Sequence, residues 1–200
     1  KSVLSISRHN ISSAIKSQGT VSEQTIDTLV NDFINEPDLE STLEGIVNVQ
    51  VKMKDFEGAK KTYQKMANLF PNEPYKDNKN IDFLKYDIFK HIDSNEYAEA
   101  EIKIKQLVDN YSGNKHSPVA LTLIAERFYE KAMTQDKNEQ PQLAKANLKR
   151  AADIWETIIK EIPGSAEKAD SCHWLGEVYR KMGDYEQSLH YWKKIVSDYP

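Results

Sequence analysis

Residues 169–200 carry the pattern that most constrains how this chain can fold. Apolar and small residues recur there at intervals of three and four, which is the spacing of one helix face, both before Gly183 and after it. Gly183-Asp184 predicts a turn between the two runs, and Pro200 predicts an end to the second because proline cannot continue a helix. We therefore expect two antiparallel helices. Such a pair cannot bury its own apolar face, so neighbouring pairs are also expected.

Small residues mark where these two helices should approach most closely. Gly176 and Ser188 allow the backbones to come together, and Tyr179, Tyr185 and Trp192 would fill the space around them. This order of small and aromatic positions, followed by a proline, resembles one tetratricopeptide repeat. The resemblance implies an all-α fold, a right-handed solenoid built from helical hairpins.

The same pattern recurs along the chain and divides it into five parts. The expected parts are a degenerate N-terminal hairpin at 1–37, repeats at 38–73 and 79–113, a stretched repeat with an insertion at 117–164, and a repeat at 165–200, together forming a single solenoid. The small residues of the second helices are Ala59, Ala100, Ala151 and Ser188. They are spaced more widely than the 34 or so residues of a regular array, so this array is divergent.

Several expected element boundaries rest on local signals. Thr20–Glu23 and Ser41–Glu44 each fit a capping box, in which a hydroxyl and a carboxylate satisfy the free N–H groups of a helix start. A solvated loop is expected at 135–140, followed by a helix from Gln142 to Glu161. Residues 1–36 leave two alternatives open, a degenerate hairpin or a partly disordered arm.

Composition narrows the classes of partner. The net charge is −4, and both signs are mixed along the chain. A nucleic-acid-binding surface requires a basic stripe, so nucleic acid is not expected as the main partner. No apolar run approaches the 20 or so residues that cross a bilayer, so no transmembrane segment is expected.

No residue pattern indicates catalysis or a cofactor. The five histidines are scattered, and His173 with Glu177 supplies only two of the three or four ligands that a zinc site requires. Glycine-rich phosphate loops and hydrolase motifs are absent from the sequence. Cys172 is the single cysteine, which is expected to be a buried thiol. We therefore expect no enzyme activity, no cofactor and no bound metal.

The resemblance to tetratricopeptide repeats implies where a ligand would bind. In that family the first helices of the repeats line a concave groove, and ligands contact the face opposite the small residues. Carried onto this sequence, the candidate groove residues are Glu44, Asn48, Asp82, Lys85, Phe89, Thr122, Glu126, Asp170, His173, Glu177, Arg180 and Lys181. The alternative is that these residues are simply solvated helix faces.

Two subgroups of the family allow a closer comparison. Chaperone-binding members of the family clamp a carboxylate with lysine and asparagine, but Glu44 and Val119 stand at two lysine positions, although Asn48 matches the asparagine. This chain is therefore not expected to form that clamp. Residues 162–169, with the segments after Trp174 and Gly183, are similar to repeats of bacterial cell-envelope proteins. That similarity favours a bacterial periplasm or cell envelope over the cytoplasm.

The expected function is that of an interaction scaffold, which binds a peptide or protein segment in its concave groove. The main alternative is a regulatory or docking domain of a larger enzyme or sensor. A third is a small-molecule or metal-binding solenoid, or a hydrolase on a helical scaffold. The chain stops at the terminating Pro200, and its last helix carries a wide apolar band. We therefore expect a segment of a longer protein, whose uncapped last helix allows self-association.

Overall fold

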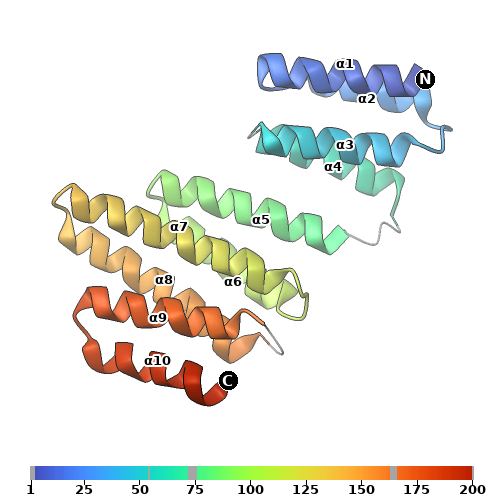
Figure 1. Ribbon diagram of the computed structural model, residues 1–200. Helices are drawn as coiled ribbons and strands as arrows, with labels where there is room; N and C mark the ends of the chain where they lie inside the picture. Colours follow the sequence, from blue (N-terminus) through green and yellow to red (C-terminus); the bar gives the residue numbers. More distant parts are fainter. Residues whose placement is uncertain (1–2, 54, 72–75, 163–165, 200) are drawn as a thin grey trace. The chain divides into compact units, whose positions relative to one another are not determined.

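The computed structural model describes residues 3–53, 55–71, 76–162 and 166–199 (Figure 1). These residues form ten α-helices and no strand, which confirms the all-α prediction. The helices are α1 (Val3–Gln18), α2 (Glu23–Phe33), α3 (Leu39–Lys52), α4 (Phe56–Leu69), α5 (Lys76–Asp93), α6 (Tyr97–Tyr111), α7 (Ser117–Lys137), α8 (Pro141–Glu161), α9 (Lys168–Met182) and α10 (Tyr185–Asp198).

The chain divides into two compact units. The first is Lys1–Lys76 and contains α1 to α4, and the second is Asp77–Pro200 and contains nearly all of α5 with α6 to α10. The expectation that all five helix pairs form one continuous solenoid stays a prediction.

The first unit is built on the α3–α4 pair. Ile46 and Val47 of α3 are buried, and so are Ala59 and Tyr63 of α4. Helix α1 packs against α3 and buries Leu4, Ile11 and Ile15. Helix α2 contacts α4 through ion pairs, since Lys65 Nζ lies 2.7 Å from Asp27 Oδ1 and 3.1 Å from Glu23 Oε1. The α1 and α2 helices therefore pack mainly on the following pair rather than on each other.

Both expected capping boxes are wrong. The N-cap of α2 is Ser22, whose Oγ accepts from the Thr25 backbone N–H at 3.2 Å, while Thr20 Oγ1 donates to Asp55 Oδ2 at 2.7 Å. Helix α3 begins earlier than expected, at Leu39, whose side chain is fully buried. Ser41 thus lies inside the helix, where its hydroxyl donates to the Asp38 carbonyl. Burial of Leu39 extends α3 towards the N-terminus past the expected cap Ser41. The hydrogen bond from Thr20 to Asp55 occupies the hydroxyl that was expected to cap α2.

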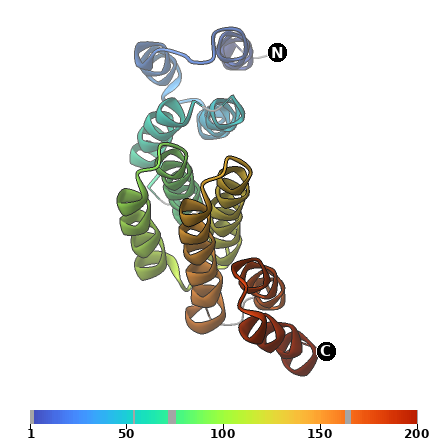
Figure 2. The same ribbon diagram turned by 90° about the vertical axis from the view of Figure 1, so that its left-hand side faces the viewer.

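The second unit is built around the long α7–α8 pair, whose helices lie side by side in both views (Figure 1, Figure 2). Each helix has 21 residues. The extra length of this repeat therefore lies in two long helices, and the loop expected at 135–140 is wrong at its start. Gln135 is buried inside α7, where it accepts a hydrogen bond of 2.8 Å from Asn147 Nδ2. The turn itself is 138–140, with Glu139 in the left-handed region at φ 59°.

Helices α9 and α10 form the close pair expected from the sequence. Ser188 Oγ donates to the Gly176 carbonyl oxygen at 2.8 Å across the pair. A Cβ atom on Gly176 would lie 2.1 Å from Trp192 Nε1, a distance that no real contact allows. Gly183 ends α9 with φ 82°, and Asp184 caps α10 by accepting from the Gln187 N–H. The Trp192 ring can occupy its place only because residue 176 has no side chain.

Two side chains of α8 hold this last pair. Trp155 stacks on Trp174 of α9 with ring centroids 5.6 Å apart. Glu156 Oε1 accepts from Tyr179 of α9 at 2.9 Å and from Tyr191 of α10 at 3.1 Å. Burial raises the pKa of Glu156, but the ion pair with Lys160 and the two tyrosine hydrogen bonds outweigh it and leave the pKa below its ordinary value. The Glu156 carboxylate therefore joins three helices.

Candidate functional site

Side chains join the first helices of the second unit, α5, α7 and α9. Arg127 of α7 donates to Asp93 of α5 from both Nε (2.9 Å) and Nη2 (2.7 Å), and its guanidinium lies over the Phe89 ring. On the other side of α7, the Tyr129 ring meets Trp174 of α9 edge-on, with centroids 5.5 Å apart. We call the face that these three helices share the first-helix face. On α7 it is the side that carries Val119, Leu123, Glu126 and Glu130.

The α7 strip of the first-helix face lies between these two contacts. Because helical residues turn by about 100° each, Val119, Leu123, Glu126 and Glu130 lie between the α5 side and the α9 side. Val119 is 47% exposed and Leu123 is 39% exposed. Burial raises the pKa of Glu126, and the neighbouring Glu130 carboxylate raises it further. The strip thus combines an exposed apolar patch with two acidic side chains.

The predicted residues Thr122 and Glu126 both lie on α7 and are half-buried. The Thr122 hydroxyl is buried and has no hydrogen-bond partner among the described residues. Glu126 belongs to the exposed strip of α7, and Thr122 borders it.

The predicted residues of α5 are largely occupied by contacts within that helix. Lys85 is 9% exposed, and its Nζ donates to Asp82 Oδ1 at 2.8 Å and lies over the Tyr86 ring. Phe89 is half-buried against Tyr86. Lys85 and Asp82 therefore offer a neutral pair rather than a free cation.

The predicted residues of α9 lie at the other edge of the first-helix face. Asp170, His173, Arg180 and Lys181 are exposed, and Glu177 is half-buried. Arg180 Nη2 donates to Glu177 Oε2 at 2.8 Å, and this hydrogen bond lowers the pKa of Glu177. The His173 ring packs edge-on against Trp174.

The remaining predicted residues, Glu44 and Asn48, lie in the first unit. Both are exposed on α3. Between them, a Cβ atom on Gly45 would lie 2.2 Å from the Arg8 guanidinium, so α1 covers the adjoining part of α3. These two residues are therefore not part of the first-helix face of the second unit.

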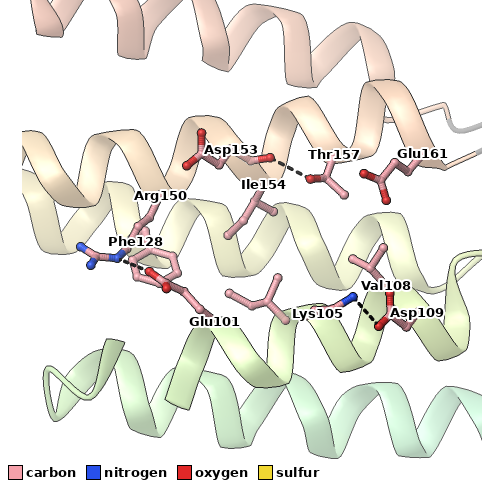
Figure 3. Close-up of a pocket in the computed structure, with 11 residues that line it drawn as sticks. Glu101, Lys105, Val108, Asp109, Phe128, Arg150, Asp153, Ile154, Thr157 and Glu161 are labelled. Carbon is pink, nitrogen blue, oxygen red and sulfur yellow. Dashed lines mark hydrogen bonds and ion pairs between the residues drawn. The ribbon is translucent and has the colours of Figure 1, made fainter. Parts of the chain in front are cut away.

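Sequence reasoning missed a cleft between the second helices α6 and α8 (Figure 3). Its volume is about 300 Å³. The lining residues are Glu101, Ile104, Lys105, Val108 and Asp109 of α6, Phe128 of α7, and Arg150, Asp153, Ile154, Thr157 and Glu161 of α8. We call it the α6–α8 cleft. The sequence signal was present in Ile104 and Val108, but the family resemblance directed attention to first helices only.

Other kinds of site would require a cluster of metal ligands, a membrane-spanning helix or a reactive thiol. In that part of the chain, no group of three or more histidine, cysteine or acidic side chains is placed to hold a metal ion. No described helix combines the length and the apolar character needed to cross a membrane. Cys172 is fully buried, and burial raises the pKa of its thiol, which disfavours the reactive thiolate.

Comparison with known proteins agrees with the helix pairs. The family model described as tetratricopeptide repeat matches residues 46–73, which include α4, and residues 173–200, which include α10. These two segments therefore carry the pattern of a tetratricopeptide repeat. The second matched segment contains the Gly176–Ser188 contact and Trp192, so the matched pattern coincides with the close packing of α9 on α10. Tetratricopeptide repeats generally mediate protein–protein interactions, and their groove-forming faces are extended binding surfaces.

The chain also has a curated relative, tetratricopeptide repeat protein 29 of Trypanosoma brucei brucei. The two are 34% identical over 69 residues, which is 34% of this chain but only 14% of the relative. The chain thus matches a small part of that protein's length. Nothing in these comparisons supports the resemblance to bacterial cell-envelope repeats.

Proposed function

We propose that this chain is a non-catalytic scaffold that binds a peptide or protein segment along the first-helix face, which would form the concave groove of its repeats. The observation that carries this proposal is the exposed strip of α7. Val119 and Leu123 are exposed there, between helices that are held together by the Arg127–Asp93 ion pair and the Tyr129–Trp174 contact. Exposed apolar side chains on a surface fixed in this way favour binding, because the surface loses little conformational entropy when the partner docks.

The charges of the first-helix face indicate the chemistry of the partner. Glu130 already pairs with Arg127, whose Nη1 lies 3.3 Å from Glu130 Oε2, whereas Glu126 lies half-buried on the strip that carries the exposed apolar side chains. A cationic side chain of a bound segment would pair with the Glu126 carboxylate and relieve its repulsion by Glu130. We therefore propose a protein segment that carries an apolar residue beside a cationic one, and not a nucleic acid, whose phosphates these carboxylates would repel. Binding is expected to weaken as salt is added, since the charged groups are partly exposed.

The test uses two leucines with similar exposure. Leu123 lies on the first-helix face at 39% exposure, and Leu143 lies on α8 at 48%. The chain is used as bait in an extract of its source cells, and recovered proteins are quantified at low and high salt. Leu123→Asp is expected to reduce recovery of a specific partner by about tenfold, the effect of losing one apolar contact of about 1.4 kcal/mol. Leu143→Asp should leave recovery unchanged, and equal behaviour of the two variants would contradict the proposal.

We also propose that α10 lets two copies of the chain associate. Tyr185 is 71% exposed, Leu189 50% and Val196 78%, and they lie along one side of this helix. Two such bands can cover each other across a twofold axis. Leu189→Glu with Val196→Glu is expected to abolish concentration-dependent association in light scattering. A wild-type chain that stays monomeric at every concentration would refute this.

A further inference from the structure

The α6–α8 cleft has an apolar floor below a charged rim. Ile104 and Val108 of α6 are half-buried, whereas Phe128 and Ile154 are buried beneath the opening. In Figure 3 the α6 residues line one side and the α8 residues line the other. The floor therefore offers room for an apolar side chain, and any such side chain must pass between charged groups to reach it.

The rim of the cleft carries more acidic than basic side chains. It carries the carboxylates of Glu101, Asp109, Asp153 and Glu161 against only two cations. Both cations already have partners, because Lys105 Nζ lies 2.7 Å from Asp109 Oδ2 and Arg150 Nε lies 2.8 Å from Glu101 Oε1. Asp153 Oδ1 lies 3.1 Å from Nζ of Lys149, a residue outside the cleft. Glu161 interacts electrostatically with Lys105 and Lys160. The cleft lining therefore holds two more carboxylates than cations, and Asp153 and Glu161 lie on its α8 side.

One end of the cleft is held rigid by a polar network. The Arg150 guanidinium lies 4.4 Å from the Tyr97 ring centroid and donates to Asn147 Oδ1 at 3.2 Å. Asn147 Nδ2 in turn donates to the Tyr97 hydroxyl and to Gln135 Oε1. The network joins α6, α7 and α8, so the distance between the two walls is fixed before anything binds. A site organised in this way loses little entropy on binding.

We propose that the α6–α8 cleft is a second binding site, which takes a basic segment of a partner protein. An apolar side chain of that segment enters between Ile104, Val108 and Ile154, and its lysine or arginine residues pair with Asp153 and Glu161. The complementarity of charge selects the partner, and the apolar floor provides the contact area. This site lies on second helices and does not depend on the function proposed for the first-helix face.

The experiment uses three synthetic eight-residue peptides as probes. The first is acetyl-Gly-Lys-Ile-Lys-Lys-Phe-Lys-Gly-amide, the second replaces its lysines by glutamate, and the third replaces its isoleucine and phenylalanine by serine. Dissociation constants are measured by fluorescence anisotropy, and the contact surface is mapped by amide chemical shifts of the whole chain. The first peptide is expected to bind at least about tenfold more tightly than either of the others, with shifts concentrated on α6 and α8.

Matched charge reversals separate this site from general attraction to an acidic protein. Asp153→Lys with Glu161→Lys is expected to weaken binding of the first peptide by about tenfold. Asp136→Lys with Glu186→Lys changes the net charge equally, at exposed positions outside the cleft, and should have less than about a twofold effect. Equal weakening by both pairs, equal binding of the serine peptide, or shifts centred elsewhere would each overturn the proposal.

Discussion

Replacing Trp155 by alanine is expected to lower the free energy of unfolding by about 4 kcal/mol. The Trp155 side chain is fully buried and stacks on Trp174 with their planes 5° apart. Its removal leaves a cavity between α8 and α9, and it also removes the aromatic contact between the two last helix pairs. The loss is measured by urea unfolding followed by circular dichroism.

Trp155→Phe provides the control for this prediction. Phenylalanine keeps an aromatic ring in the stack, and it removes the Nε1–H group, which is buried without a hydrogen-bond partner in the described residues. We therefore expect less than half of the alanine loss. An unfolding midpoint of Trp155→Ala that equals that of the wild type would show that the stack does not stabilise the second unit.

Replacing Gly176 by leucine is expected to lower the free energy of unfolding by about 3 kcal/mol. Leucine favours helices, so local propensity alone would stabilise α9. The loss arises instead because even a Cβ atom would lie 2.1 Å from Trp192 Nε1. The α9–α10 pair must then separate, or the Trp192 ring must leave its place.

Gly113→Leu is the matched control, because nothing lies within 4 Å of a Cβ atom at that position. Its effect is expected to stay within about 0.5 kcal/mol. In a double-mutant cycle, Trp192→Ala should remove much of the Gly176→Leu loss, since the two side chains would no longer compete for space. Similar losses at Gly176 and Gly113 would contradict the packing described for the last pair.

The sequence could predict the helix pairs, but not all of their ends. Gly176, Ser188 and Trp192 are close in sequence and follow a repeated order, so the α9–α10 contact could be inferred. The start of α3 could not, because it depends on how deeply Leu39 is buried by the rest of the first unit. Gln135 extends α7 for a similar reason, since its hydrogen-bond partners Asn147 and Tyr97 come from other helices.

The helix positions of the candidate site could be predicted from the sequence, but the burial and the contact partners of each side chain could not. The repeat pattern pointed to Lys85 as a groove cation, yet the structure buries it beside Asp82. Arg127 was missed because its partner Asp93 lies on a different helix. The α6–α8 cleft was missed because it depends on how α6 and α8 flank Phe128, which no local pattern reveals.

The most direct measurement of the proposed scaffold function is site-specific photo-crosslinking in the source cells. A photoreactive amino acid is placed at Leu123 on the first-helix face or, as the control, at Leu143, and the crosslinked peptides are sequenced. We expect position 123 to crosslink to one recurring segment of a partner protein, with position 143 giving no such product. The absence of an adduct at position 123, or the same adducts at both positions, would contradict binding on the first-helix face.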